Sequence, residues 1–388
     1  MLSYGSSVKA FIEADTLLVL GSIFVILTFF SNLSFALPRF AVQNGSSCIA
    51  CHVNPTGSGL RNDYGSNVVA LEELPLERWL DKGNEDWDGY ISDHLQIGGD
   101  FRLQGVQYND SDNKRRSAFF PMQADIYSYL KLNNNASIFT KIGVRGSSRL
   151  SAEYWALVNN LPQNAWVRVG RTLPNYGLRV DDHTSFIRGG NFNRTLLDLD
   201  KEGLIFGPYL DPPVIIELGV PMFGGLQWTS SISTDVLNNS SEELNNLTTQ
   251  FNYIGNINDN IAYMGGFSYM QENNFSMLGI SGGISFSDFT WTFEADQAEN
   301  WIDGNTSLAL YDEIAWEIIQ GVQLIGKYDF FDPKTDWQTG SISRYTFGAE
   351  IYPLNIMEIK LQLRMNQVDL DNAATTDPEY LIQTHFWF

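Results

Sequence analysis

From about residue 92 to its end, the chain alternates apolar and polar residues with a period of two. Residues 359–366 read Ile-Lys-Leu-Gln-Leu-Arg-Met-Asn, and residues 124–132 and 289–294 follow the same rule. Successive side chains of a strand point to opposite faces, so each segment has one apolar and one polar face. The polar faces carry lysine, arginine, aspartate and glutamate, as expected around an aqueous lumen. The pattern therefore predicts a membrane β-barrel of about 16 antiparallel strands.

The final segment carries the same signal to the last residue. Tyr380, Ile382, Thr384, Phe386 and Phe388 share one parity. A terminal strand with an outward aromatic row resembles the assembly signal of bacterial outer-membrane barrels, whose aromatic side chains form girdles at the membrane interfaces. A soluble β-sandwich would also alternate, but it would not need this ending. We therefore expect an all-β fold, an outer-membrane β-barrel over residues 92–388.

Residues 1–36 have the pattern of an export signal. Lys9 precedes an apolar run, residues 17–30, that is short for a helix spanning a bilayer. Ser34 and Ala36 provide the small residues that favour cleavage after Ala36. An uncleaved membrane anchor is the alternative. Export agrees with a barrel in the outer membrane.

The segment between the signal and the barrel, residues 37–91, holds the most specific motif. Cys48, Cys51 and His52 form Cys-x-x-Cys-His, and the chain has no other cysteine. This spacing is the attachment motif for one c-type haem, with both thiols as thioethers and the histidine as proximal iron ligand. A redox pair or a disulfide is disfavoured. No thioredoxin-like pattern flanks the motif, and so short a disulfide loop would hardly stabilise a long chain.

The haem segment is too short to enclose a haem and contains no second ligand. No histidine lies between His52 and His94, and no methionine lies between the first residue and Met122. We therefore expect the barrel portion to supply the distal ligand. His183 is favoured, because a loop adjusts to an iron more easily than a strand. His94 and His385, expected on lumen faces of the first and last strands at the periplasmic mouth, are alternatives, as are Met122 and an open site.

One connection is too long for a turn. About thirty residues separate the expected strand 165–172 from the next one, near Gly203, and connections of this length are usually functional. As the third outer loop, it is expected to fold into the lumen. A further short strand pair inside the barrel is the alternative. Its charged residues include Arg179, Asp181, Asp182, Arg188 and Arg194.

The net charge limits the kinds of partner that the protein can bind. The chain has 24 Lys and Arg against 45 Asp and Glu, a formal net charge of −21. Nucleic acid is thereby excluded as a partner, because phosphate binding needs a basic surface. Acidic loops such as those with Asp181 and Asp182, or Glu242 and Glu243, could instead concentrate cations. A merely solubilising surface excess fits equally well.

Taken together, these features resemble a known family. An export signal, one N-terminal Cys-x-x-Cys-His, a short haem segment and a barrel ending in Phe388 are similar to the outer-membrane fused monohaem cytochrome c–porins. Some members of that family are iron oxidases of iron-oxidising bacteria. The stretch 166–171, followed by Tyr176-Gly177, also resembles phosphate-selective porins. The resemblance implies a haem docked in or at the barrel, but it does not specify the substrate.

These expectations converge on an outer-membrane electron conduit. One covalent haem c, at the periplasmic mouth or inside the barrel, would pass electrons between an extracellular donor and periplasmic carriers such as soluble cytochromes. Fe(II) is the favoured donor, which leaves open whether the chain is an Fe(II)-oxidising enzyme. Two alternatives stay open. One is a solute porin with a haem-bearing plug or redox gate, and the other is a barrel that only anchors a periplasmic cytochrome.

Overall fold

The computed structural model describes residues 38–43, 45–76, 87, 89–109, 114–145, 149–180, 182–190, 202–205, 211–237, 242–258, 260–302, 304–370 and 373–388. The expected export signal, residues 1–36, lies outside this part of the chain, as do Asp181 and Arg194. None of the helices in the described residues combines the length and the apolar character needed to cross a membrane.

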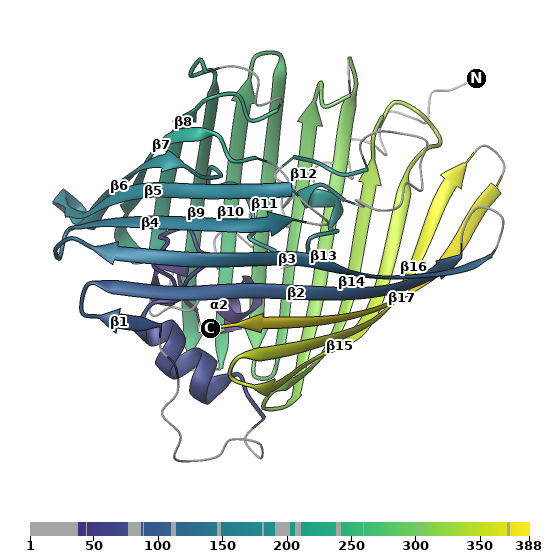
Figure 1. The fold of residues 1–388 in the computed structure, drawn as a ribbon. Coiled ribbons are helices and arrows are strands. Elements are labelled where there is room, and N and C mark those ends of the chain that lie inside the picture. The colour runs from purple at the N-terminus through teal and green to yellow at the C-terminus, as the bar shows by residue number, and fades with distance from the viewer. Residues whose placement is uncertain are drawn as a thin grey trace.

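The described strands form one closed antiparallel barrel (Figure 1). The sheet has 17 strands, of which β1 is only three residues long, so 16 strands, β2–β17, form the wall. Each wall strand pairs with its neighbour in the chain, and β17 pairs with β2 to close the sheet. The expected barrel and its strand number are confirmed.

The strands are β1 (Tyr90–Ser92), β2 (Leu95–Asn109), β3 (Arg115–Lys131), β4 (Ala136–Arg145), β5 (Arg149–Leu161), β6 (Ala165–Arg171), β7 (Val214–Pro221), β8 (Leu226–Ser233), β9 (Asn246–Asn258), β10 (Ile261–Glu272), β11 (Phe275–Phe286), β12 (Phe289–Glu299), β13 (Thr306–Ile319), β14 (Val322–Asp332), β15 (Ile342–Leu354), β16 (Met357–Leu370) and β17 (Ala373–Trp387). The described helical turns are α2 (Pro38–Gln43), η1 (Cys48–Ala50), η2 (Gly65–Glu73), η4 (Pro162–Asn164), η5 (Phe186–Arg188) and η6 (Phe223–Gly225).

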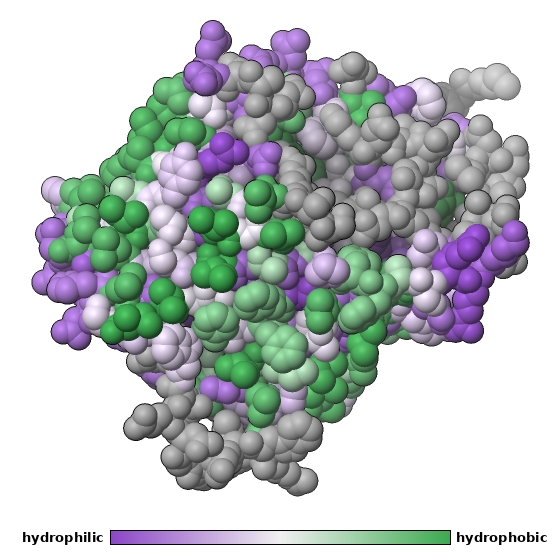
Figure 2. Space-filling view, viewed as in Figure 1, coloured by the Kyte–Doolittle hydropathy of each residue, from purple (hydrophilic) through white to green (hydrophobic). Residues whose placement is uncertain are grey.

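The two faces of the wall differ as the alternation predicts. Ile126 and Phe347 point outward and are 60% and 58% exposed, whereas the adjacent Asp125 and Thr346 are buried on the lumen side. Figure 2 shows hydrophobic residues over the front strands, with hydrophilic residues gathered towards the ends of those strands. An apolar outer band with a polar inner face is the arrangement of a transmembrane barrel in lipid.

The last strand has the predicted parity. Tyr380, Ile382, Phe386 and Phe388 are exposed on the outer side, and the ring of Phe388 stacks on Phe101 with the centroids 6.2 Å apart. The intervening Gln383, His385 and Trp387 are buried on the lumen side. Closure against β2 thus orients the final aromatic row towards lipid.

The long connection runs from β6 to β7 and is longer than expected. The expected strand near Gly203 is not found in residues 202–205, the part of this stretch that is described: Glu202 forms only an isolated bridge with Gly190, and β7 begins at Val214. Two prolines, Pro212 and Pro213, immediately precede β7, and proline has no N–H to donate to a strand ladder. We call this connection, residues 172–213, the long loop. Its described parts fold into the lumen, as predicted.

The N-terminal residues 38–76, which we call the plug, also lie inside the barrel. The helix α2 contacts β10, β11 and β12, and its purple ribbon lies behind the front strands in Figure 1. On the opposite wall, the Gln96 side chain donates to the Arg61 carbonyl, and Arg168 donates to the Asn54 side chain at 2.5 Å. The plug therefore bridges the lumen near the end where β2 starts.

A charge placed on the outer band tests the lipid-facing assignment. Phe347→Arg, midway along β15, should lower the free energy of unfolding by about 2–4 kcal/mol, because its guanidinium would face hydrocarbon. Phe223→Arg, in a turn where the side chain is 83% exposed, should change it by about 0–1 kcal/mol. Denaturant titrations in lipid vesicles measure both values. Equal effects of the two substitutions would contradict the assignment.

Candidate functional site

A cavity of about 540 Å³ lies between the plug, the long loop and the barrel wall. Its lining includes Cys48, Cys51 and His52 from the plug, His183 from the long loop and His385 from β17. The volume is in the range of small-molecule and cofactor sites, about 300–1,000 Å³. The fold thus brings the haem-attachment motif and two of the three histidines proposed as distal ligands to one cavity.

The motif adopts a local turn that suits attachment to one ring edge. Residues Cys48–Ala50 form the 3₁₀ turn η1, and the His52 amide donates to the Cys48 carbonyl at 3.1 Å. Side chains three residues apart eclipse one another in such a turn, so both thiols project to the same side. The cysteines are present as thiols and not as a disulfide. Burial raises the pKa of the Cys48 thiol, whereas redox Cys-x-x-Cys motifs have a lowered pKa.

The ring of His52 is oriented by the backbone. Its Nδ1 lies 3.3 Å from the carbonyl oxygen of Gly59, so an Nδ1–H donor there leaves the lone pair on Nε2. Metal-bound histidines usually donate their second ring nitrogen to a carbonyl in this way. The side chain of Asn62 donates to the carbonyls of Ile49 and Ala50 and holds the turn against the following segment.

Two glycines allow the motif to pack closely. A Cβ at Gly57 would lie 3.0 Å from the Cβ and 3.1 Å from the sulfur of Cys48, and the φ of Gly57 is +83°. A Cβ at Gly65 would overlap the carbonyl oxygen of Cys51. The loop after the motif and the start of η2 therefore lie directly against the two cysteines, which requires residues without side chains.

The walls near the motif are aromatic and apolar. Phe40 and Cys51 pack with Tyr352 and Trp387 in one buried cluster, and the Phe40 and Tyr352 rings meet edge-on with the centroids 6.3 Å apart. Leu60 packs in a second cluster with Tyr127, Phe139, Trp155 and Trp166 on the inner wall. Flat apolar surfaces beside a Cys-x-x-Cys-His turn fit the donor set and shape that a haem c requires.

Two arginines contribute positive charge to the cavity. Arg61 from the plug and Arg179 from the long loop both line it. Burial lowers the pKa of each guanidinium, with Arg168 adding to the effect at Arg179, so counter-charge does not offset burial. The Arg179 Nε atom has no hydrogen-bond partner in the described residues. This surplus of cations fits a ligand with carboxylate groups, as haem has.

The histidines proposed as distal ligands differ in their surroundings. His183 lines the cavity from the long loop. His385 also lines it, but its Nδ1 is 3.1 Å from Glu358 and its Nε2 is 3.1 Å from Asp100, so both ring nitrogens already face carboxylates. His385 would therefore have to give up a carboxylate contact before it could bind an iron.

The expected position of His94, on the lumen face of the first strand, is wrong. This residue is exposed in the turn between β1 and β2, with Nδ1 3.0 Å from the carbonyl of Lys131, and it does not line the cavity. The hydroxyl of Ser92 accepts from the amides of His94 and Leu95, which forms a local turn before β2 begins. The alternation of residues had predicted a lumen-facing His94, but the strand β2 begins one residue later, at Leu95.

The methionine expected as an alternative distal ligand also differs from the one that the structure places at the cavity. Met122 is buried in β3 but does not line the cavity. Met264 in β10 does line it and packs with Val42, Leu178 and other apolar residues. Sequence reasoning missed Met264 because nothing local marks it. The only signal was its place in an alternating strand, which many residues share.

Ion pairs anchor the long loop to the wall. Asp182 lies 3.4 Å from Arg364 and 3.7 Å from Lys327. Burial would raise the pKa of this carboxyl, but the two cations hold it well below its usual range. Arg188 binds Glu294 at 2.5 Å. Asp182 is therefore a structural anchor, and the expectation that it attracts cations from outside does not hold.

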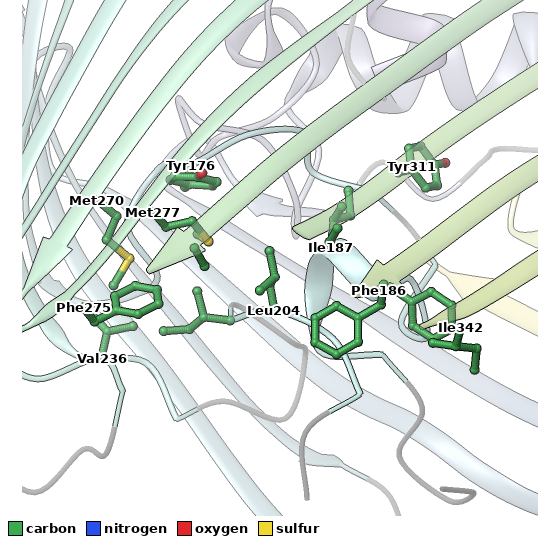
Figure 3. Close-up of a cluster of buried hydrophobic side chains, with 14 of the residues drawn as sticks. Tyr176, Phe186, Ile187, Leu204, Val236, Met270, Phe275, Met277, Tyr311 and Ile342 are labelled. Carbon is green, nitrogen blue, oxygen red and sulfur yellow. The ribbon is translucent and has the colours of Figure 1, made fainter. Parts of the chain in front are cut away.

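Beyond these ion pairs, an apolar layer lies in the lumen against β10–β16 (Figure 3). Phe186, Ile187 and Leu204 of the long loop are at most 1% exposed and pack against inward residues of β10–β16. The layer consists of Tyr176, Phe186, Ile187, Leu204, Ile205, Val236, Met270, Phe275, Met277, Ala298, Ala309, Tyr311, Phe331, Ile342 and Val368. At this level, packed protein occupies the part of the expected aqueous lumen that borders β10–β16. Among the described residues, no group of three or more His, Cys, Asp or Glu is arranged to hold a metal ion.

Comparison with known proteins identifies the fold. The chain is similar to the anion-selective porin of Comamonas acidovorans (10% identity, TM-score 0.53, 76% of this chain and 99% of that chain). It is also similar to OmpF of Salmonella typhi in complex with daunomycin (13%, 0.53, 76% and 97%) and to OprB of Pseudomonas putida (9%, 0.54, 76% and 94%). At these identities, the likeness establishes the porin-type barrel fold. Neither a family model nor a curated protein matches the sequence.

Close packing of the plug can be tested at Gly65. Gly65→Ala should weaken docking of the plug by about 1–3 kcal/mol, because the new methyl group overlaps the Cys51 carbonyl. Gly265→Ala in β10 is the control, since no atom lies within 4 Å of its added Cβ. Hydrogen exchange of residues 45–76, followed by mass spectrometry, reports the docking. Unchanged protection in Gly65→Ala would show that the plug packs differently.

Proposed function

We propose that this protein is an outer-membrane electron conduit of the fused cytochrome c–porin type. Cys48 and Cys51 attach one haem c, His52 is the proximal ligand and His183 the distal one. Electrons pass from a reduced donor outside the cell, with Fe(II) favoured, to periplasmic carriers such as soluble cytochromes. The short turns and the plug face the periplasm, and the long loop enters from the outer side. When bound, the haem supplies a one-electron redox centre within the insulating bilayer.

One observation carries the proposal: the Cys-x-x-Cys-His turn lies inside the barrel and lines a cavity shared with His183. A haem attached there is held by residues of the plug and enclosed by the barrel wall. This answers the difficulty that residues 37–91 are too short to enclose a haem alone. It also argues against the barrel as a mere anchor for a cytochrome that faces the periplasm.

The chain's own residues supply the conditions for such a centre. His52 is oriented through its Nδ1 contact with Gly59, and the cluster of Phe40, Tyr352 and Trp387 gives the cavity an apolar wall. A dry pocket and the identity of the axial ligand are the main means by which a protein sets a haem potential. The hydrocarbon core of the membrane is about 30 Å thick, so a cofactor held within the barrel shortens the distance that an electron must cross.

The packed residues in the lumen favour the conduit over the runner-up, a solute porin with a redox gate. The porin-type fold favours the runner-up, but a hydrophilic solute would meet the apolar layer and the plug in series. We therefore expect negligible conductance. Glu242 and Glu243, exposed in the connection between β8 and β9, are the acidic pair left to concentrate Fe(II) weakly at the outer surface.

The distal ligand can be assigned by spectroscopy. His183→Ala should convert a low-spin haem to high spin, because it removes the cavity histidine proposed as the distal ligand. His94→Ala and His385→Ala should leave the spin state unchanged. Optical and electron paramagnetic resonance spectra report it. Conversion by Met264→Leu alone would transfer the role to methionine, and no change in any variant would indicate an open site.

Vectorial electron transfer tests the function itself. Vesicles containing the oriented protein and a sealed oxidised acceptor should show acceptor reduction within seconds of adding Fe(II) outside. The Cys48→Ala/Cys51→Ala variant should carry no covalent haem on a denaturing gel and should transfer no electrons. Ion conductance is recorded on the same vesicles. Conductance without acceptor reduction, in folded and haem-loaded protein, would replace the conduit by the gated porin.

A further inference from the structure

Arg61 and Arg179 are unusual among the cations of the lumen. Most inward-facing arginines and lysines of the described residues bind a carboxylate, as Arg39 and Arg168 do with Glu350 and Glu217. In contrast, no carboxylate oxygen of the described residues lies within 4.0 Å of either the Arg61 or the Arg179 guanidinium. Both nevertheless line the haem cavity.

The acids nearest to these two arginines are engaged elsewhere. Asp100 is the acid whose charge raises the pKa of Arg61 most. It binds Arg102 at 3.2 Å and His385 at 3.1 Å. Glu217 and Glu153, on the side of Arg179, bind Arg168 at 2.7 Å and Lys141 at 2.5 Å. The wall therefore cannot neutralise the two guanidiniums without breaking other buried pairs.

Neutral contacts hold both guanidiniums in place. Arg61 lies over the ring of Trp387, 4.8 Å from its centroid. Arg179 donates to the Thr56 hydroxyl of the plug at 3.4 Å and to the Pro174 carbonyl at 3.3 Å, while its Nε has no partner. A buried cation held by weak contacts beside a cavity of this size is suited to a bound anion, because an unpaired buried charge is costly.

The geometry assigns Arg61 and Arg179 as the binding site for the two propionate carboxylates of the haem. This assignment rests on the proposed function and deepens it. Guanidinium–carboxylate pairs are the strong, directional form of hydrogen bond, and one arginine comes from the plug while the other comes from the long loop. The haem carboxylates would therefore join the two lumen segments, and the two arginines are positioning residues that also act on the redox equilibrium.

Removing either cation should stabilise the oxidised haem, which carries the additional positive charge. We expect Arg61→Gln and Arg179→Gln each to shift the one-electron equilibrium about tenfold towards oxidation, a fall of about 59 mV in midpoint potential. The double variant should shift it further. The propionate bending band in resonance Raman spectra should move in each variant, which a purely structural role would not produce without a change in spin state.

Matched variants keep the test decisive. Lys131→Gln removes the same charge from an exposed position at the end of β3 and should change neither potential nor Raman band. Arg61→Lys and Arg179→Lys preserve charge if a glutamine variant fails to fold. They should keep the potential while moving the Raman band.

The outcomes separate the two proposals. A haem-loaded wild type whose arginine variants leave both readouts unchanged, or an equal shift in Lys131→Gln, overturns this assignment alone. A folded wild type without covalent haem on a denaturing gel overturns the conduit and this assignment together. Shifts confined to the arginine variants support both.

Discussion

Charge neutralisation inside the lumen is the constraint on which the rest of the structure depends. An ion moved from water into protein loses hydration worth several kcal/mol, which only a well-placed partner offsets. The plug enters with Arg39, which reaches Glu313 and Glu350, and the long loop enters with Arg188, which reaches Glu294. These partners lie on strands far along the chain, so the pairs fix where plug and loop sit. The cavity is the space that this arrangement leaves.

Apolar residues, ion pairs and the cavity occupy successive levels along the lumen. Towards the outer end, the apolar residues of the long loop pack against inward side chains such as Phe331 and Ile342. Below them comes the belt of ion pairs around Asp182, and below that the cavity with its aromatic walls and the plug. Beside β10–β16, such layering would keep bulk water away from the Cys-x-x-Cys-His turn. That exclusion is what an electron-transfer site requires and what an open solute channel would lack.

Much of the fold could be predicted because its signal repeats in every strand. Each strand faces lipid on one side and the lumen on the other. The same alternation of apolar and polar residues therefore recurs in strand after strand, as at 359–366 and 124–132. Single positions were less predictable. His94 misled because one local turn, built on the Ser92 hydroxyl, removes it from the strand. The stretch near Gly203 misled because isolated apolar residues in a buried loop resemble a short strand.

For the candidate site, the sequence by itself marked the residues proposed to carry the chemistry: Cys48, Cys51 and His52 lie so close together that their spacing alone predicts a haem. It also determined the barrel and the outward face of its last strand, because lipid imposes a periodic pattern. Only the tertiary structure decided that the motif lies within the lumen, that Asp182 is an anchor, and that Arg61 has no acidic partner within the described part of the chain. Those properties depend on pairings between residues distant in the chain, and such pairings leave no local pattern to be recognised.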